Sequence, residues 1–195
     1  MTVQSAEDPE ANKGQDASDR RERILDAALS LFAEHGVEGT TMKMLARKAN
    51  ISAGLTYHYF ESKVDLLDQV IKSRVSSFPD LDGRHHEPVD TVLPEFSLQM
   101  GKNLRERIDV IWLFFREYRS SETVSTQIGM RREECVNSLA SYLRARQSVG
   151  EVRGIDCRVA SRGLLGSLFH IHLLEEPPRE FVLELVEIFL AGIKS

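Results

Sequence analysis

The sequence predicts an all-α protein, and three observations support this. Apolar residues recur at the three-to-four-residue spacing of amphipathic helices over most of the chain, and the breaks between these stretches carry Gly, Pro, Ser or Thr. No segment alternates apolar and polar residues as a half-buried strand does. The chain has 195 residues, of which 42% are hydrophobic, so one globular unit or two small ones can bury a sizeable core.

Composition sets limits on the location and class of the protein. Residues 1–19 hold five acidic residues and one Lys with few large apolar side chains, which predicts a disordered acidic tail and no signal peptide. No apolar run approaches the roughly 18 residues that a membrane span needs. Cys135 and Cys157 have no metal-type spacing. We therefore expect a cytoplasmic protein that has no membrane partner, metal or cofactor.

The first predicted helix covers the stretch DRRERILDAALSLFAEHG, which begins at Asp19 as a capping residue. Its core-facing stripe consists of Ile24, Ala28, Leu31 and Phe32. Gly36 follows the last turn, where a left-handed residue often ends a helix.

Two short helices are predicted next. Thr40 or Thr41 can cap the helix TMKMLARKA, and Asn50 suits a turn that needs a positive φ. Ser52 then caps a third helix that runs to Tyr59. A longer helix is predicted from about Ser62 to Phe78, and further helices follow the loop PDLDGRHHEP up to the last helix, FVLELVEIFLAGI.

Two short helices joined by a tight turn and preceded by a stabilising helix describe a helix-turn-helix module. The N-terminal half of the second helix carries the small residues Ser52, Ala53 and Gly54, which let a backbone approach DNA closely. Polar tips follow at Thr56, Tyr57 and His58. Lys63 lies in the first turn of the next helix, where backbone N–H groups also favour a phosphate.

The aromatic run from Tyr57 to Phe60 has to divide between two surfaces, because consecutive residues of a helix do not share one face. The alternative, in which all four rings are core, conflicts with this geometry. Some of these rings therefore have to face solvent or a partner.

The stretch TTMKMLARKANISAGLTYHYFESKVDLL resembles the signature of TetR-type transcriptional regulators, and the resemblance extends over Arg20 to Leu67. The matching positions are Thr40, Leu45-Ala46, Ala49-Asn50-Ile51-Ser52, Gly54, Tyr57, Tyr59-Phe60, Ser62-Lys63 and Leu66-Leu67. Three positions depart from the family pattern. Asn50 replaces a glycine, Met44 stands where an acid is common, and Thr56 takes the place of Leu or Ile.

The resemblance implies a role for each matching residue. Tyr57 and Lys63 would bind phosphates, His58 would lie at the DNA surface, and Lys43 would be nearest to base edges together with Ser52 and Ala53. Tyr59 and Phe60 would turn inward. Thr40, Gly54 and Thr56 complete the predicted DNA-binding set, with Thr56 either filling space under the helix or reaching DNA through its hydroxyl. Arg20, Arg21 and Arg47 either contact phosphates or form a solvated face.

After the acidic tail (1–19) that composition predicts, the resemblance implies a DNA-binding domain (20–66) and a helical effector-binding and dimerisation domain (67–195). The family dimerises through its last two long helices. The residues expected at the dimer interface are Leu164, Leu168, Phe181, Leu185, Ile188 and Phe189. The alternative is that these two helices close the core of the monomer.

Family members bind small effectors between their central helices. The residues expected to line this pocket are Met100, Trp112, Phe115, Arg116, Tyr118 and Met130, with an ordinary core role as the alternative for each. Taken together, these features predict a ligand-responsive homodimeric regulator, a repressor that leaves a palindromic operator when its small-molecule effector binds.

The net charge of −5 does not exclude DNA, because residues 20–75 hold nine basic and seven acidic residues. The competing hypothesis is an all-α enzyme or binder with a vestigial DNA-binding head. The sequence shows no Gly-rich phosphate loop, metal-ligand cluster or nucleophile motif. We therefore expect a regulator and not an enzyme.

Overall fold

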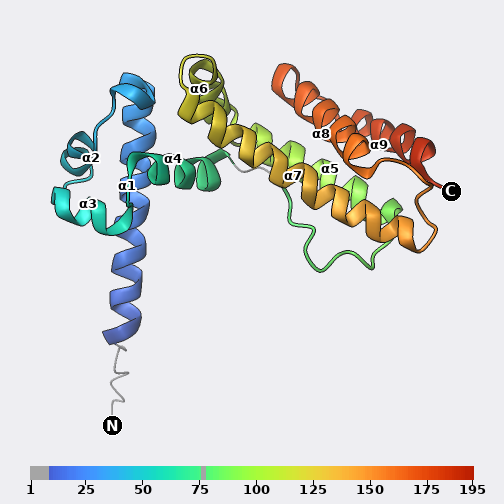
Figure 1. The fold of residues 1–195 in the computed structure, drawn as a ribbon, viewed down its shortest axis with the longest axis horizontal. Coiled ribbons are helices and arrows are strands. Elements are labelled where there is room, and N and C mark those ends of the chain that lie inside the picture. The colour runs from blue at the N-terminus through green and yellow to red at the C-terminus, as the bar shows by residue number, and fades with distance from the viewer. Residues whose placement is uncertain (1–8, 76–77) are drawn as a thin grey trace, which may run out of the picture. The chain divides into compact units, whose positions relative to one another are not determined.

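The structure is a computed structural model that describes residues 9–75 and 78–195, and its regular elements over these residues are helices (Figure 1). Their bounds are α1 (Pro9–Gly39), α2 (Met42–Lys48), α3 (Ala53–Tyr59), α4 (Lys63–Val70), the π-helical turn η1 (Ile71–Val75), α5 (Val89–Arg105), α6 (Ile108–Tyr118), α7 (Glu122–Ser148), α8 (Cys157–Leu174) and α9 (Arg179–Ile193). The predicted all-α class is confirmed for this part of the chain. None of these helices combines the length and apolarity that a membrane span requires.

The described residues form two compact units. Unit 1 comprises those of Met1–Ser73 together with Arg116–Ser125, and unit 2 comprises Arg74–Phe115 and Thr126–Ser195. Helices α6 and α7 therefore each contribute residues to both units. The corner between them, residues 116–125, belongs to unit 1, although it is about 50 residues beyond the predicted end of the DNA-binding domain. Unit 2 is the larger of the two.

Helix α1 begins at Pro9, which differs from the disorder expected for residues 1–19. Residues 1–8 lie outside the described part of the chain. Five of the eleven residues from Pro9 to Asp19 are strong helix formers: Glu10, Ala11, Lys13, Gln15 and Ala17. Because the amphipathic stretch after Asp19 supplies the costly nucleus, adding turns at its N-terminal end needs only propagation.

The core of unit 1 forms where α1 packs against α2 and α4. Its fully buried side chains come from all three helices and from the segments between them: Ile24, Leu25, Phe32, Val37, Leu45, Phe60, Leu66 and Leu67. The stripe predicted from helical spacing in α1 is buried as expected.

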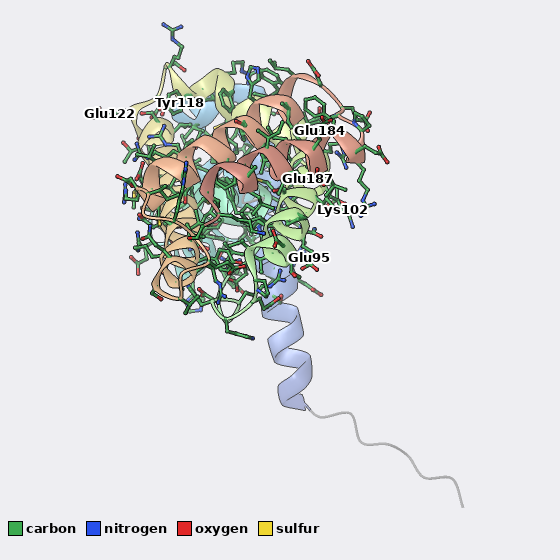
Figure 2. All side chains as sticks on the ribbon, turned by 90° about the vertical axis from the view of Figure 1, so that its right-hand side faces the viewer. Glu95, Lys102, Tyr118, Glu122, Glu184 and Glu187 are labelled. Carbon is green, nitrogen blue, oxygen red and sulfur yellow. The ribbon has the colours of Figure 1, made fainter. Side chains whose placement is uncertain are left out.

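In unit 2, α5 packs against α8 and α9. Figure 2 shows the polar residues Glu95 and Lys102 on α5, and Glu184 and Glu187 on α9. The loop before α5 is fixed by the buried Tyr142 of α7, whose hydroxyl donates to the Glu87 carbonyl at 3.0 Å. This helical core supports the exposed faces of α8 and α9 described below.

Candidate nucleic-acid interface

The turn between α2 and α3 is a Schellman motif centred on Asn50. Asn50 has a φ of 54°, the only positive φ at a non-glycine residue among the described residues. The Ile51 N–H donates to the Ala46 carbonyl at 3.0 Å, and the Asn50 N–H donates to the Arg47 carbonyl at 3.2 Å. Asn therefore replaces the glycine of the family pattern without loss of the turn, because its side chain tolerates the left-handed region.

Hydroxyl caps fix where the helices on both sides of this turn begin. Thr41 accepts the Met44 N–H at 3.2 Å, which decides between the two predicted caps of α2. Ser52 accepts the Leu55 N–H at 3.1 Å at the start of α3. Ser62 accepts the Asp65 N–H at 3.1 Å at the start of α4. These caps set the register of α3, and the register decides which side chains point outward.

The outward face of this module carries most of the residues predicted to meet DNA. Lys43, Ser52, Ala53, Gly54, Tyr57 and His58 are all exposed. The Tyr57 side chain is 55% exposed, which is unusual for an aromatic residue in a well-packed helix. Apart from its chain neighbours and the backbone of α3 itself, no heavy atom of the described residues lies within 4 Å of the position that a Cβ would take at Gly54. The start of α3 therefore offers a flat surface with small side chains and two protruding rings.

The inward face of α3 is held by Phe60 and Thr56. Phe60 is 1% exposed, and the Arg21 guanidinium of α1 lies 5.5 Å above its ring. Arg21 also donates to the Gln69 side chain of α4 at 2.8 Å, so its role in this structure is packing between helices. The expectation that Phe60 turns inward is confirmed, while Tyr59 is only half-buried.

Two residues of the predicted DNA-binding set lie inside the unit, and their assignment is corrected. Thr56 is 0% exposed and its hydroxyl donates to the Ser52 carbonyl at 3.3 Å. Of the two predicted roles, Thr56 therefore has the first: it fills space under the helix, at a position where the family pattern has Leu or Ile. Thr40 is 1% exposed and donates to the Gly36 carbonyl at 2.8 Å. Both hydroxyls satisfy local carbonyls and do not reach the surface.

Lys63 lies at the edge of the module, but its ammonium group is occupied. Nζ donates to the Val37 carbonyl at 3.0 Å and the Glu38 carbonyl at 3.2 Å. It also donates to the Glu38 carboxylate at 3.4 Å. These bonds cap the C-terminal end of α1, where a cation is favoured by the helix dipole.

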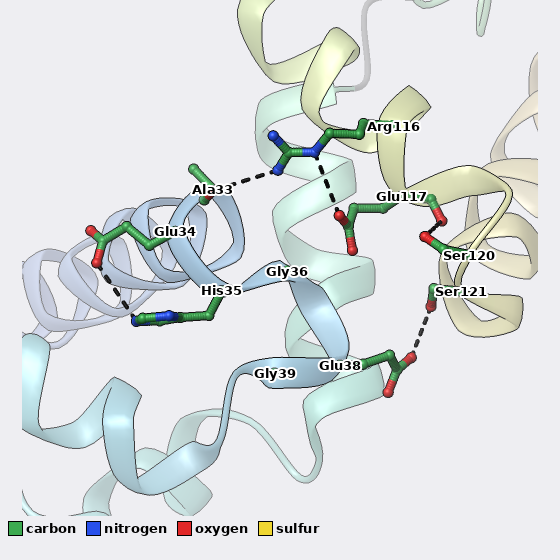
Figure 3. A pocket seen from close by; sticks show the side chains of 10 residues that line it. All are labelled: Ala33, Glu34, His35, Gly36, Glu38, Gly39, Arg116, Glu117, Ser120 and Ser121. Carbon is green, nitrogen blue, oxygen red and sulfur yellow. Dashed lines mark hydrogen bonds and ion pairs between the residues drawn. The ribbon is translucent and has the colours of Figure 1, made fainter.

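The corner between α6 and α7 contacts the same turn of α1. The Glu117 carboxylate accepts the Val37 N–H at 3.3 Å. The Ser121 hydroxyl donates to Glu38 at 2.8 Å (Figure 3). Gly36 fits here because its φ of 72° suits glycine and a Cβ would lie 3.0 Å from the Glu117 carboxylate. Sequence reasoning missed Glu38, Glu117 and Ser121, because their partners are about 80 residues apart in the chain.

A polar cavity of about 410 Å³ lies between these segments of unit 1. Its lining consists of Ala33, Glu34, His35, Gly36, Glu38, Gly39, Arg116, Glu117, Ser120 and Ser121. Arg116, predicted to meet an effector, lines this cavity instead. Its guanidinium lies 3.6 Å from Glu117 and donates to the Ala33 carbonyl at 3.4 Å.

The charge of the candidate interface is positive despite the acidic chain. Residues 41–63 hold Lys43, Arg47, Lys48 and Lys63 against one acid, Glu61. Lys43 and Arg47 are exposed on α2, whereas Lys48 pairs with Glu34 at 2.6 Å. A local excess of this kind is sufficient to attract phosphates, since they respond to nearby charge over about 10 Å.

Comparison with known proteins identifies this module. Residues 24–70 match the model described as "Bacterial regulatory proteins, tetR family". The match covers the helix-turn-helix, part of α1 and the whole of α4. The resemblance drawn from the sequence motif is thereby confirmed for the part of the chain that carries the helix-turn-helix.

Curated relatives that match part of the chain are regulators by name. The HTH-type transcriptional repressor KstR2 of Rhodococcus jostii (strain RHA1) is 37% identical over 89 residues, 46% of this chain and 40% of that protein. The HTH-type transcriptional regulator BetI of Agrobacterium fabrum (strain C58 / ATCC 33970) is 46% identical over 54 residues, 28% of this chain and 26% of that protein. The chain thus spans less than half the length of these relatives.

Solved structures extend the likeness of the fold over nearly the whole chain. Salmonella enterica GusR has a TM-score of 0.66 at 24% identity, covering 89% of this chain and 94% of that one. A transcriptional regulator from Aquifex aeolicus VF5 has a TM-score of 0.60 at 22% identity, covering 89% and 98%. The predicted arrangement, an N-terminal helix-turn-helix domain with a larger helical C-terminal domain, is the TetR-like fold.

The residues predicted for a TetR-family dimer interface divide into two groups in the structure. Leu164 and Leu168 are 2% and 0% exposed in the core of unit 2, so they close the monomer core, and this part of the expectation is corrected. Phe181 and Ile188 on α9 are 47% and 66% exposed, and Leu185 and Phe189 are half-buried.

The six residues predicted to line an effector pocket also differ in their surroundings. Met100 is fully buried in the core of unit 2, and Met130 is 53% exposed on α7. Trp112 and Phe115 are exposed neighbours on α6 with ring centroids 6.1 Å apart, and Phe115 stacks on Phe169 of α8 at 5.7 Å. Arg116 and Tyr118 belong to unit 1.

Proposed function

We propose that the protein is a DNA-binding transcription regulator whose α2–α3 module reads the major groove. The observation that carries this proposal is that α3 has one exposed face and one buried face. Tyr57 and His58 point outward beside a flat Ser52–Gly54 surface, while Thr56 and Phe60 fix the helix from behind. Buried anchors make the exposed face rigid, and a rigid helix face is what recognition of base edges requires.

Each exposed residue has a distinct part in the proposed complex. The Tyr57 hydroxyl and the exposed Arg47 of α2 contact phosphates, which position the protein without reading sequence. Lys43, Ser52 and Ala53 lie nearest to base edges. Gly54 leaves room for the sugar-phosphate backbone because no side chain stands there.

The proposed active form is a homodimer, since two half-sites about 34–36 Å apart need two modules. The partner-binding face is on α8 and α9, where Val159, Leu174, Phe181 and Ile188 are exposed apolar residues. Cβ positions at Gly163 and Gly166 of α8 have no heavy atom within 4 Å, so a second helix can approach there closely. Apolar residues around small ones suit helix-on-helix packing.

We further propose that the protein is a repressor that a small molecule releases from DNA. The name of the relative KstR2 includes the word repressor, which supports the sign of regulation. The exposed rings of Trp112 and Phe115 in unit 2 offer apolar surface to such a molecule. Such a ligand binds more tightly to one relative orientation of the two DNA-binding modules, one that does not fit the operator. Its difference in affinity for the fitting and non-fitting orientations sets how far operator affinity falls.

The proposal is tested by selecting duplexes from a random DNA library with the purified protein and sequencing the bound fraction. We expect an inverted repeat whose half-sites are about one helical turn apart. Affinity for the selected duplex is then measured between about 50 and 200 mM salt, where each phosphate contact contributes a slope of about −0.9. Selection without a shared motif, together with affinity that does not respond to salt, would contradict the proposal.

A further inference from the structure

Lys63 is the point where two hydrogen-bonded routes from the α6–α7 corner converge. In the first, Glu117 accepts the Val37 N–H, and the carbonyl of Val37 accepts from Lys63. In the second, Ser121 donates to one carboxylate oxygen of Glu38, and the other oxygen accepts from Lys63. All these residues lie in unit 1.

The ammonium of Lys63 has no donor left for a phosphate in this arrangement. A lysine has three N–H donors, and Nζ contacts three acceptors at 3.0, 3.2 and 3.4 Å. The longest of the three bonds is the one to the Glu38 carboxylate. Its release would free one N–H while both carbonyl bonds continue to hold the side chain against α1.

Glu38 is held in place from the other side by Ser121. Ser121 is 3% exposed, and its hydroxyl donates to the Glu38 carboxylate at 2.8 Å. This hydrogen bond and the charge of Lys63 hold the pKa of Glu38 below its usual range, so the carboxylate is ionised at neutral pH. An ionised Glu38 and a DNA phosphate are alternative partners for the same ammonium group.

We propose that Glu38, positioned by Ser121, is an autoinhibitory latch that competes with a DNA phosphate for Lys63. This inference rests on the proposed DNA-binding function. Because Ser121 lies at the start of α7, a displacement of the corner changes how firmly Glu38 holds Lys63. Polar contacts across an open cavity make such a latch weak and reversible.

The test compares four proteins in binding a fluorescein-labelled duplex of the selected sequence, measured by anisotropy at fixed salt. Glu38→Gln removes the charge of the latch and keeps the shape of the side chain. We expect it to bind the duplex about three-fold more tightly per half-site, the size of one partly exposed ion pair. Lys63→Met and the double variant Glu38→Gln/Lys63→Met complete a double-mutant cycle. When Lys63 is already Met, Glu38→Gln should no longer raise DNA affinity, because no ammonium is left to release.

Two matched controls separate the latch from general charge effects. Glu61→Gln removes the same charge two residues from Lys63, and Ser120→Ala removes the hydroxyl next to Ser121 in the same cavity lining. Ser121→Ala, which removes the hydroxyl that positions Glu38, is measured beside them. We expect each control to change affinity less than Glu38→Gln or Ser121→Ala does. Thermal unfolding and circular dichroism of every variant show whether it has folded.

The outcomes distinguish the latch from the function on which it rests. If the unaltered protein binds no duplex, the proposed function is overturned and the latch with it. If the unaltered protein binds, and Glu38→Gln binds no tighter than Glu61→Gln, the latch alone is overturned. The latch is also overturned if Glu38→Gln raises DNA affinity equally in the unaltered protein and in the Lys63→Met variant.

Discussion

The imidazole of His172 occupies the notch that Gly101 leaves in α5. A Cβ built at Gly101 would lie 2.1 Å from His172 Nε2, well inside van der Waals contact. The other ring nitrogen, Nδ1, lies 2.8 Å from the Leu168 carbonyl of α8, and the side chain is 3% exposed. The pair therefore fixes how closely α5 and α8 pack in the core of unit 2.

Gly101→Ala is expected to destabilise the protein by about 1–3 kcal/mol, because the added methyl group would overlap the buried His172 ring. Chemical denaturation monitored by circular dichroism measures the change. The matched control is Gly129→Ala in α7, where no heavy atom lies within 4 Å of the new Cβ and a gain of up to about 1 kcal/mol is expected. A neutral Gly101→Ala variant would show that α5 and α8 pack less tightly than described.

The stability of the protein is expected to fall as the pH drops below the ordinary range of histidine. Burial lowers the pKa of His172 below 6.5, so its neutral form is favoured in the folded state. A group with a lowered folded pKa contributes stability above its unfolded pKa and loses that contribution as the pH falls through the folded pKa.

His172→Asn serves as the comparison, because its amide can donate to the Leu168 carbonyl and does not titrate. Unfolding free energies are measured from pH 7.5 downward in both proteins. The decline should be shallower in the variant between the unfolded pKa of histidine and the lower folded value. Parallel curves would show that His172 does not contribute to acid sensitivity.

Thr56→Val is expected to leave DNA affinity within about two-fold of the unaltered protein, because the buried hydroxyl makes only a local bond at 3.3 Å. The cost in stability should stay below about 1.5 kcal/mol, since one hydrogen bond is lost without a cavity. Anisotropy with the selected duplex and thermal unfolding provide both values. A ten-fold loss of affinity without a loss of stability would restore the alternative in which Thr56 contacts DNA.

Gly54→Leu is expected to fold normally and to bind DNA at least ten-fold more weakly. The open space around residue 54 accommodates the side chain in the free protein, but the leucine then stands where the duplex must approach. Gly54→Ala is the control and should be as stable as the unaltered protein or more so. Retained affinity in the leucine variant would place the DNA elsewhere on the surface.

The local features of the helix-turn-helix could be predicted from the sequence because neighbouring residues determine them. Ser52 has the hydroxyl that a helix start requires, and Asn50 tolerates the φ of 54° that the turn requires. Because four consecutive rings cannot lie on one helix face, the aromatic run was expected to divide between two surfaces, and the family resemblance implied that Phe60 turns inward. In each case the physical cause lies within a few residues of its effect.

The contacts of Lys63 could not be predicted, because they depend on segments far apart in the chain. Its spacing and the family resemblance indicated a phosphate ligand, whereas Val37 and Glu38 hold its ammonium in the structure. The burial of Leu164 and Leu168 was missed for a related reason. Helical spacing identifies an apolar face but not whether the same chain or a second copy covers it.

The central claim is that the exposed face of α3 binds DNA, and the affinity of Tyr57→Ala for the selected duplex tests it most directly. The side chain is 55% exposed, so its removal should not affect folding. We expect an affinity loss of about ten-fold or more, consistent with about 1–3 kcal/mol for a lost contact, and no change for the control His86→Ala in the loop before α5. Unchanged affinity in a folded Tyr57→Ala protein would contradict the account.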